Sequence, residues 1–288
     1  MTQASSSPQT ITPALREWIV AQAEAGHDAP SVLKAMLDSG WQEDVAIQAM
    51  ETTLSDHLEA QALQQGLPPR SAVPEPDLDE SPLCIDAGDR EVSVLLVMAQ
   101  PRIVVFGNLL SEEECEGLIA AARPRMARSR TVATQTGGEE VNPDRTSDGM
   151  FFGRGESELI QRIEARIARL VRWPVENGEG LQVLNYQPGA EYKPHYDYFD
   201  PQEPGTPTIL RRGGQRVGTV VMYLNKPEKG GGTSFPDRHM EVAPQRGNAV
   251  FFSYERPHPS TGTLHGGAPV LAGEKWIATK WLREREFN

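Results

Sequence analysis

Cysteine is scarce in this sequence, and long apolar runs are missing from it. Only Cys84 and Cys115 occur among 288 residues, and two isolated thiols suit a reducing compartment better than a disulfide framework. No stretch approaches the roughly 20 consecutive apolar residues that a membrane-spanning helix needs. The first eight residues have neither the basic start nor the apolar core of a secretory signal. We therefore expect a soluble, cytoplasmic protein with free thiols.

Basic side chains are few in the first 80 residues, which carry 13 acidic but only 3 basic ones. The whole chain has a formal net charge of -12. An acidic segment repels phosphate backbones and anionic lipid surfaces, so we expect neither nucleic acid nor a membrane as a partner. A basic protein partner would be attracted. On the simpler interpretation, the charges only keep a small domain in solution.

Three amphipathic helices are predicted within residues 1–60. Polar start signals and glycine stops place them at about 12–26, 28–40 and 42–58, and apolar residues recur at helical spacing in each. Together they predict a compact, acidic three-helix bundle, which resembles ubiquitin-associated-like bundles. Such a bundle would bind a protein partner or pack on the rest of the chain, and the sequence leaves both open.

Two further segments follow this helical part. Residues 61–85 contain five prolines among polar residues and no apolar periodicity, which is typical of a semi-extended linker. Residues 86–288 are predicted to form a second domain, with early apolar strands and two helices, one capped by Ser111 and one at 156–171. Short β-rich segments then dominate, at 181–186, 216–224, 248–253 and 275–281. The pattern predicts a mainly β domain, a jelly roll with helices on one side.

Two histidines and one aspartate are candidate metal ligands. His195 and Asp197 lie two residues apart in a predicted strand, where alternate side chains share a face. His265 can supply a third ligand, and two His with one carboxylate leave three positions of an octahedral ion open, as in non-haem Fe(II) oxygenases. Lys275 would then pair with an anionic cosubstrate, because a buried ammonium needs an anion. The alternative is that Lys275 extends outward from an edge strand.

Four segments of the chain occur in the order found in one enzyme family. They lie at 145–152 (Arg-Thr-Ser-Asp-Gly-Met-Phe-Phe), 184–194, 231–236 and 265–276. Over roughly residues 145–283 the chain resembles the prolyl 4-hydroxylase branch of the Fe(II)/2-oxoglutarate-dependent dioxygenases. This resemblance implies a double-stranded β-helix for the second domain. Many relatives have Cys where this chain has Ala268, a position that binds neither metal nor cosubstrate.

The resemblance also implies the roles of the residues that bind metal and cosubstrate. Fe(II) would be held by three ligands, His195, Asp197 and His265. Lys275 would bind the distal carboxylate of 2-oxoglutarate, and Tyr186 and Thr233 would add hydroxyl hydrogen bonds to it. A lysine acts as a point charge rather than a fork, so extra hydroxyl donors would help to orient the carboxylate.

Substrate residues follow from the same resemblance. Tyr192, Arg216 and Trp281 would line the face where a peptidyl proline approaches, since extended proline-rich chains dock on aromatic grooves at low entropic cost. For Tyr192 and Trp281 the alternative is ordinary packing. Residues 200–214, rich in Pro, Gly and Arg, are expected to form a mobile loop over the site.

The leading hypothesis for function is therefore hydroxylation of a peptidyl proline at C4. The reaction would consume O2 and 2-oxoglutarate, release succinate and CO2, and need ascorbate to rescue oxidised iron. Three alternatives remain: the same chemistry on a free amino acid or small molecule, a Zn(II)-dependent hydrolase with the same ligands, and a non-catalytic binding module. The hydrolase leaves Lys275 unexplained, and the binding module predicts no succinate.

Overall fold

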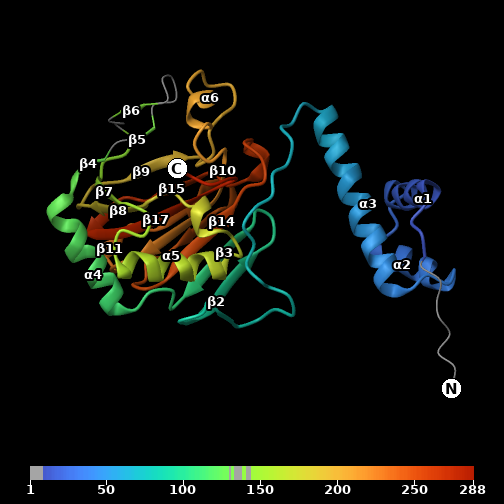
Figure 1. The fold of residues 1–288 in the computed structure, drawn as a ribbon, viewed down its shortest axis with the longest axis horizontal. Helices are drawn as coiled ribbons and strands as arrows, with labels where there is room; N and C mark the ends of the chain where they lie inside the picture. Colours follow the sequence, from blue (N-terminus) through green and yellow to red (C-terminus); the bar gives the residue numbers. More distant parts are fainter. Residues whose placement is uncertain (1–8, 130, 133–137, 141–143) are drawn as a thin grey trace. The chain divides into compact units, whose positions relative to one another are not determined.

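The computed structural model describes residues 9–129, 131–132, 138–140 and 144–288 of the chain. The chain divides into two compact units, Met1–Arg70 and Ser71–Asn288, and each is described by itself (Figure 1). Among the described residues, no helix combines the length and the apolar character needed to cross a membrane.

The described part of the first unit consists of helices α1 (Pro13–Glu24), α2 (Ala29–Asp38) and α3 (Glu43–Gln64). The side chains of Thr12 and Asp28 cap α1 and α2 by accepting hydrogen bonds from backbone N–H groups one turn later. The three helices share a small apolar core, made by Ile19, Val32, Met36, Ala46, Ala49 and Met50. Helix α3 continues past its predicted end near Leu58, because residues 59–64 are all good helix formers.

The segment predicted as a linker, residues 61–85, is divided between the two units. Its first four residues complete α3, whereas the chain from Ser71 onward belongs to the second unit. The Glu75 N–H donates a hydrogen bond to the Val171 carbonyl at 2.9 Å, and Leu78 packs against the core of this unit. The proline-rich composition predicted the extended backbone, but it could not show that these residues find partners on a folded surface.

The second unit is built on a large antiparallel sheet. Among the described residues, its order is β1-β2-β3-β14-β10-β17-β8-β7-β4. The strands are β1 (Cys84–Asp86), β2 (Glu91–Met98), β3 (Ile103–Gly107), β14 (Ala249–Ser253), β10 (Arg216–Tyr223), β17 (Lys275–Arg283), β8 (Leu181–Tyr186), β7 (Asp148–Phe152) and β4 (Ala127–Arg128). The strands predicted from β-rich composition all occur here, with ends within two residues of the prediction.

A second, smaller sheet carries part of the candidate site. Its order is β13-β12-β15-β9 in the described chain, formed by Met240–Val242, Thr233–Phe235, His265–Gly267 and Tyr192–His195. Two short pairs complete the strands, β11 (Lys229–Gly230) with β16 (Val270–Ala272) and β5 (Thr131–Val132) with β6 (Glu139–Glu140). The remaining short helices are α6 (Thr206–Ile209), η1 (Arg123–Arg125), η2 (Val175–Asn177), η3 (Pro236–Arg238) and η4 (Pro259–Thr261).

Alternation along the strands separates two apolar layers. On β10, Val220 and Met222 pack with residues of helices α4 (Glu112–Ala122) and α5 (Glu158–Leu170), and these helices lie along one face of the large sheet (Figure 1). Val221 and Tyr223 point to the other face and pack with Phe235 of the smaller sheet. The domain is therefore mainly β with helices on one side, as predicted, and its facing sheets are consistent with a jelly roll.

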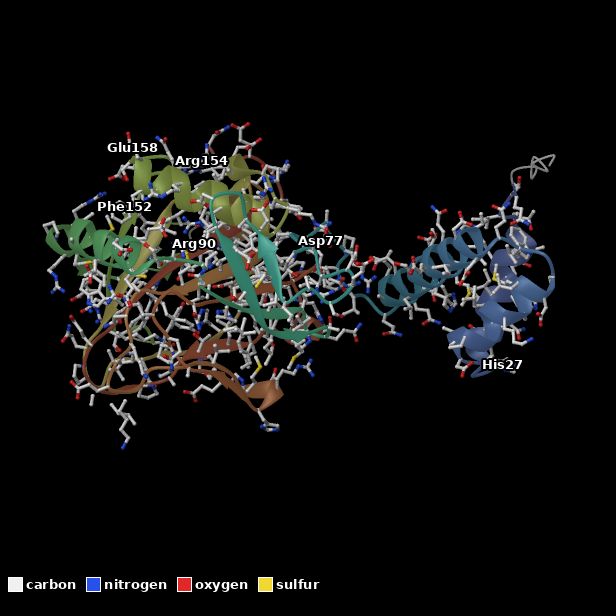
Figure 2. All side chains as sticks on the ribbon, turned by 90° about the horizontal axis from the view of Figure 1, so that it is seen from below. His27, Asp77, Arg90, Phe152, Arg154 and Glu158 are labelled. Atoms are coloured by element: carbon white, nitrogen blue, oxygen red, sulfur yellow. The ribbon has the colours of Figure 1, made fainter. Side chains whose placement is uncertain are left out.

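The helices also hold a buried ion network. Arg166 of α5 is 2% exposed and donates two hydrogen bonds of 2.7 Å to the carboxylate of Glu114 and two more to Asp89. Burial would raise the pKa of Glu114, but hydrogen bonds from Arg166, Ser111 and Arg162 lower it to about 2. By contrast, Glu158 at the start of α5 is exposed and points away from the sheets (Figure 2).

We expect Glu114→Ala to lower the free energy of unfolding by about 3–5 kcal/mol, because it leaves a buried guanidinium short of its partner. Urea unfolding of the full chain measures this change. Glu112→Ala, on the exposed side of the same first turn, is the control and should change stability by less than about 0.5 kcal/mol. Since the folded pKa of Glu114 is depressed, its contribution should fade as pH falls from about 4.5 towards about 2. Equal effects of the two substitutions would contradict the network's importance.

Candidate active site

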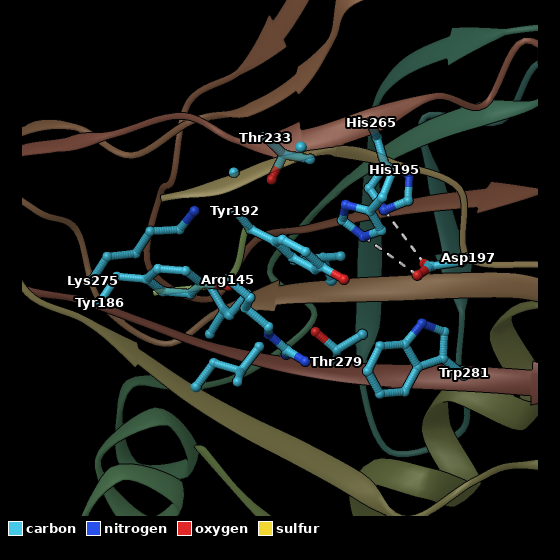
Figure 3. Close-up of a pocket in the computed structure, with 15 residues that line it drawn as sticks. Arg145, Tyr186, Tyr192, His195, Asp197, Thr233, His265, Lys275, Thr279 and Trp281 are labelled. Atoms are coloured by element: carbon cyan, nitrogen blue, oxygen red, sulfur yellow. Dashed lines mark ion pairs between the residues drawn. The ribbon is translucent and has the colours of Figure 1, made fainter. Parts of the chain in front are cut away.

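Strand pairing brings the two candidate histidines together. His195 is the last residue of β9 and His265 the first of β15, and they face each other in the antiparallel register. Asp197 follows β9 in a bend rather than in the strand itself. The predicted His-x-Asp strand therefore stops two residues early, but the bend still directs the carboxylate towards the imidazoles (Figure 3).

The three candidate ligands converge from these elements. His195 Nε2 lies 3.6 Å from Asp197 Oδ1, and His265 Nε2 lies 3.4 Å from Asp197 Oδ2. One ligand atom from each residue falls within a cluster no wider than 4.8 Å. Asp197 and His265 are buried, so these groups are largely shielded from water.

Hydrogen bonding fixes the imidazoles in the form that binds a metal. His195 Nδ1 lies 2.9 Å from the Lys193 carbonyl, and His265 Nδ1 lies 2.9 Å from the Thr263 carbonyl. A carbonyl only accepts, so each Nδ1 carries the proton and each Nε2 keeps its lone pair. Burial and the neighbouring His265 lower the pKa of His195, which favours the neutral ring.

This donor set fits a divalent cation. The two Nε2 atoms carry lone pairs and the carboxylate is ionised, so acceptor atoms face one another without a proton between them. A bound cation would remove the repulsion between these atoms. Two imidazoles and one carboxylate are the ligands of the non-haem Fe(II) triad.

A pocket extends from these ligands to Lys275, which stands at its other end (Figure 3). Lys275 begins β17 and is 2% exposed. In the described part of the chain, its ammonium makes no hydrogen bond or ion pair, and its nearest aromatic ring is that of Tyr186 at 5.3 Å. Burial lowers the pKa of Lys275 to about 8. The charge of Glu241 opposes this shift only in part, and a buried cation that contacts no anion favours binding of an anionic ligand.

Two hydroxyl residues lie in the same pocket. Tyr186 ends β8, directly opposite Lys275 in the pairing of β8 with β17. Thr233 begins β12, and its hydroxyl oxygen accepts a hydrogen bond of 2.8 Å from the Tyr223 hydroxyl. Because that oxygen already serves as an acceptor, the Thr233 proton is left to donate into the pocket.

The predicted substrate residues fall in two places. Tyr192 and Trp281 line the pocket; the Tyr192 ring stacks on His195 with centroids 3.7 Å apart, and burial raises its pKa to about 12. Arg216 does not appear among the described residues that line this pocket. Its guanidinium covers the Trp281 ring at 4.1 Å and pairs with Glu179 at 2.7 Å. A direct contact of Arg216 with substrate stays a prediction.

Two polar side chains of the pocket, those of Arg145 and Thr279, were given no role from the sequence. Arg145 is buried beside the pocket, where its guanidinium covers the Tyr192 ring at 5.0 Å and donates to Gln182 at 2.7 Å. Thr279 lines the pocket between Lys275 and Trp281 on β17. The alternation of β17 could have indicated Thr279, because residues at two-residue intervals from Lys275 share its face.

Comparison with known proteins places the chain in a family. Residues 181–283 match the 2OG-Fe(II) oxygenase superfamily. Prolyl 4-hydroxylase 5 of Arabidopsis thaliana is 42% identical over 224 residues, which are 70% of this chain and 75% of that protein. The chain belongs to the prolyl 4-hydroxylase family. It is a 2-oxoglutarate-dependent dioxygenase, and the recognition made from its motifs is confirmed.

Other relatives of the family are similar over comparable lengths. Prolyl 4-hydroxylase 1 of Arabidopsis thaliana is 44% identical over 207 residues, 66% of this chain and 71% of that protein. Among solved structures, a viral collagen prolyl hydroxylase from Paramecium Bursaria Chlorella virus-1, in its 2OG complex, has a TM-score of 0.49 and 30% identity over 63% of this chain and 95% of that one.

We expect divalent cations to stabilise the protein through the three converging ligands. At a free Fe(II) or Mn(II) concentration a hundredfold above the dissociation constant, stability should rise by about 2.7 kcal/mol, measured anaerobically by thermal unfolding. His265→Ala should remove this gain. The control is His239→Asn, since His239 is exposed and its positive φ of 50° suits asparagine. A gain that survives in His265→Ala would place the cation elsewhere.

Proposed function

We propose that this dioxygenase hydroxylates a prolyl residue of a peptide or protein at C4 and releases succinate and CO2. The observation that carries the proposal is the ammonium of Lys275, which contacts no carboxylate in the described chain and is buried across one pocket from the three convergent ligands. A dicarboxylic keto acid has the matching chemistry, with one anionic end for Lys275 and one chelating end for a metal. The named relatives, prolyl 4-hydroxylases, favour a prolyl substrate.

His195, Asp197 and His265 would hold Fe(II) in this enzyme. When bound, the metal would supply the O2 chemistry that couples decarboxylation of 2-oxoglutarate to oxidation of a substrate C–H bond. The protein would contribute three fixed ligands and leave three positions of the ion open. Ascorbate would serve as the reductant that returns oxidised iron to the ferrous state.

Lys275, Tyr186 and Thr233 would bind the distal carboxylate of 2-oxoglutarate. Lys275 would provide the charge, which in a buried site is worth more than in water. The Thr233 proton, directed by the hydrogen bond that its oxygen accepts from Tyr223, would fix the carboxylate's rotation. In this way the cosubstrate's keto-acid end would be presented to the metal.

Tyr192 and Trp281 would receive the prolyl ring beside the metal ligands. Both rings are part of the pocket wall, and apolar walls exclude water from a reacting C–H group. Arg216 would fix the Trp281 ring by covering it with its guanidinium, which in turn is held by the ion pair with Glu179. The loop at 200–214, which includes α6, would cover the bound peptide.

The division of the chain into domains is also part of the proposal. Residues 86–288 would form the double-stranded β-helix, and residues 1–60 a three-helix bundle, of ubiquitin-associated-like type, that recruits a protein partner in the cytoplasm. Separate apolar cores in the two units support this division. Within the predicted linker 61–85, the residues between the end of α3 and Ser71 would connect the two.

The activity is tested by incubating the full chain with Fe(II), 2-oxoglutarate, ascorbate and a proline-rich peptide. We expect the peptide to gain the mass of one oxygen atom per turnover, with an equal amount of succinate, and amino-acid analysis to give 4-hydroxyproline. A peptide with alanine in place of proline is the control. Hydroxylation that persists in His265→Ala, or that occurs on free proline but not on the peptide, would contradict the proposal.

A second test uses the depressed pKa of Lys275. As pH rises through about 8, the free enzyme loses the ammonium, so the dissociation constant of 2-oxoglutarate should rise about tenfold between pH 7 and pH 9. Anaerobic titration calorimetry with Mn(II) in place of Fe(II) measures it. Lys275→Arg should bind more weakly at pH 7 but lose the pH dependence, because a guanidinium stays charged. If the dissociation constant of 2-oxoglutarate changes with pH equally in the wild type and in Lys275→Arg, a group other than Lys275 causes the pH dependence.

A further inference from the structure

The carboxylate of Asp197 is held from behind by a threonine that lies far from it in the sequence. Thr219 stands in the middle of β10, is fully buried, and places its Oγ1 2.7 Å from Asp197 Oδ2. Behind it, the Tyr254 hydroxyl lies 3.0 Å from the same Oγ1. Tyr254 is also buried. The three side chains therefore form a row that ends at the candidate metal ligands.

The direction of these hydrogen bonds is fixed by the number of protons. As a carboxylate, Asp197 offers only acceptors, so Thr219 must donate its single hydroxyl proton to it. The Thr219 oxygen can then only accept from Tyr254. The chain runs in one direction, from Tyr254 through Thr219 to Asp197, and hydrogen bonds in such a chain strengthen one another in a buried setting.

The two oxygens of Asp197 are thereby distinguished. Oδ2 accepts the Thr219 hydrogen bond and lies 3.4 Å from His265 Nε2, whereas Oδ1 receives no hydrogen bond from a hydroxyl, amide or guanidinium in the described part of the chain and faces His195 Nε2 at 3.6 Å. Rotation of the carboxylate about its Cβ–Cγ bond would break the short contact with Thr219. Each oxygen is thus kept facing one of the two imidazoles.

Asp197 depends on this contact because its own backbone gives it little support. It lies in the bend after β9, outside the strand ladder, and its carbonyl receives one long hydrogen bond of 3.4 Å from Arg216. Thr219, in contrast, is paired on both sides, with Phe252 of β14 and with Trp281 of β17. Its β-branched side chain is stiff at χ1. The rigid large sheet thus fixes a ligand that belongs to a more loosely held segment.

We propose that Thr219, oriented by Tyr254, is a positioning residue that presets the Asp197 carboxylate for Fe(II), an inference that rests on the proposed metal site. The row supplies the partner that ligating carboxylates in proteins need in order to keep one orientation. It acts before the metal arrives, so its effect is on metal affinity as well as on turnover.

The test compares Fe(II) binding by the full chain under anaerobic conditions in Thr219→Val, Thr219→Ser and the wild type. Thr219→Val keeps the shape and removes the hydroxyl, so Fe(II) affinity should fall about 10–100-fold. Thr219→Ser keeps the hydroxyl and should bind close to the wild-type affinity. With 2-oxoglutarate added, the charge-transfer absorption of the Fe(II) complex should shift in Thr219→Val and not in Thr219→Ser, a difference that loss of packing alone would not produce.

Circular dichroism and thermal unfolding establish that each variant is folded. Folded Thr219→Val with wild-type affinity and an unshifted spectrum overturns the inference, and so does an equal loss in Thr219→Ser. If Thr219→Val does not fold, Tyr254→Phe provides the test, because it keeps the Thr219 donor but removes its orienting partner. We expect a severalfold loss of Fe(II) affinity in Tyr254→Phe. Unchanged Fe(II) affinity overturns the inference. A wild-type protein that binds no Fe(II) would instead defeat the proposed function.

Discussion

The antiparallel pairing of β9 with β15 is the constraint on which the site depends. It sets His195 opposite His265, although these residues lie far apart in the sequence. The bend after β9 then adds Asp197 to the pair. Each imidazole is turned by a hydrogen bond to a backbone carbonyl two residues earlier, so the ring orientation is set locally once the strands have paired. A shift of one residue in this register would turn one of the histidines to the other face.

The large sheet serves as the rigid support for that small sheet. Alternation along β10 sends Val220 and Met222 to the helical layer and Thr219 towards Asp197. The same alternation along β17 puts Lys275, Thr279 and Trp281 along one pocket. Two central strands therefore carry the candidate anion site, the pocket wall and the support of a candidate metal ligand, while their opposite faces bury apolar side chains under α4 and α5.

Charge compensation distinguishes Lys275 from three other buried cations of the second unit. Arg166 is paired with Glu114 and Asp89, Arg216 with Glu179, and Lys280 with Glu164. These pairs satisfy buried charges that would otherwise be costly. In the described chain Lys275 is buried without such a partner, and burial accordingly lowers its pKa. The same physical rule that explains the other three cations therefore points to a ligand at this one.

The sequence by itself determined the strands, the capped helices, the ligand types and the family, because these depend on local periodicity, capping and motif order. It misjudged the end of α3 and placed Asp197 within a strand, and it gave no partners for residues 71–83. Only the tertiary structure decided that Arg216 lies behind Trp281 and that Thr219 reaches Asp197. These contacts join residues from different strands, and no spacing along the chain encodes which side chains meet when two sheets pack face to face.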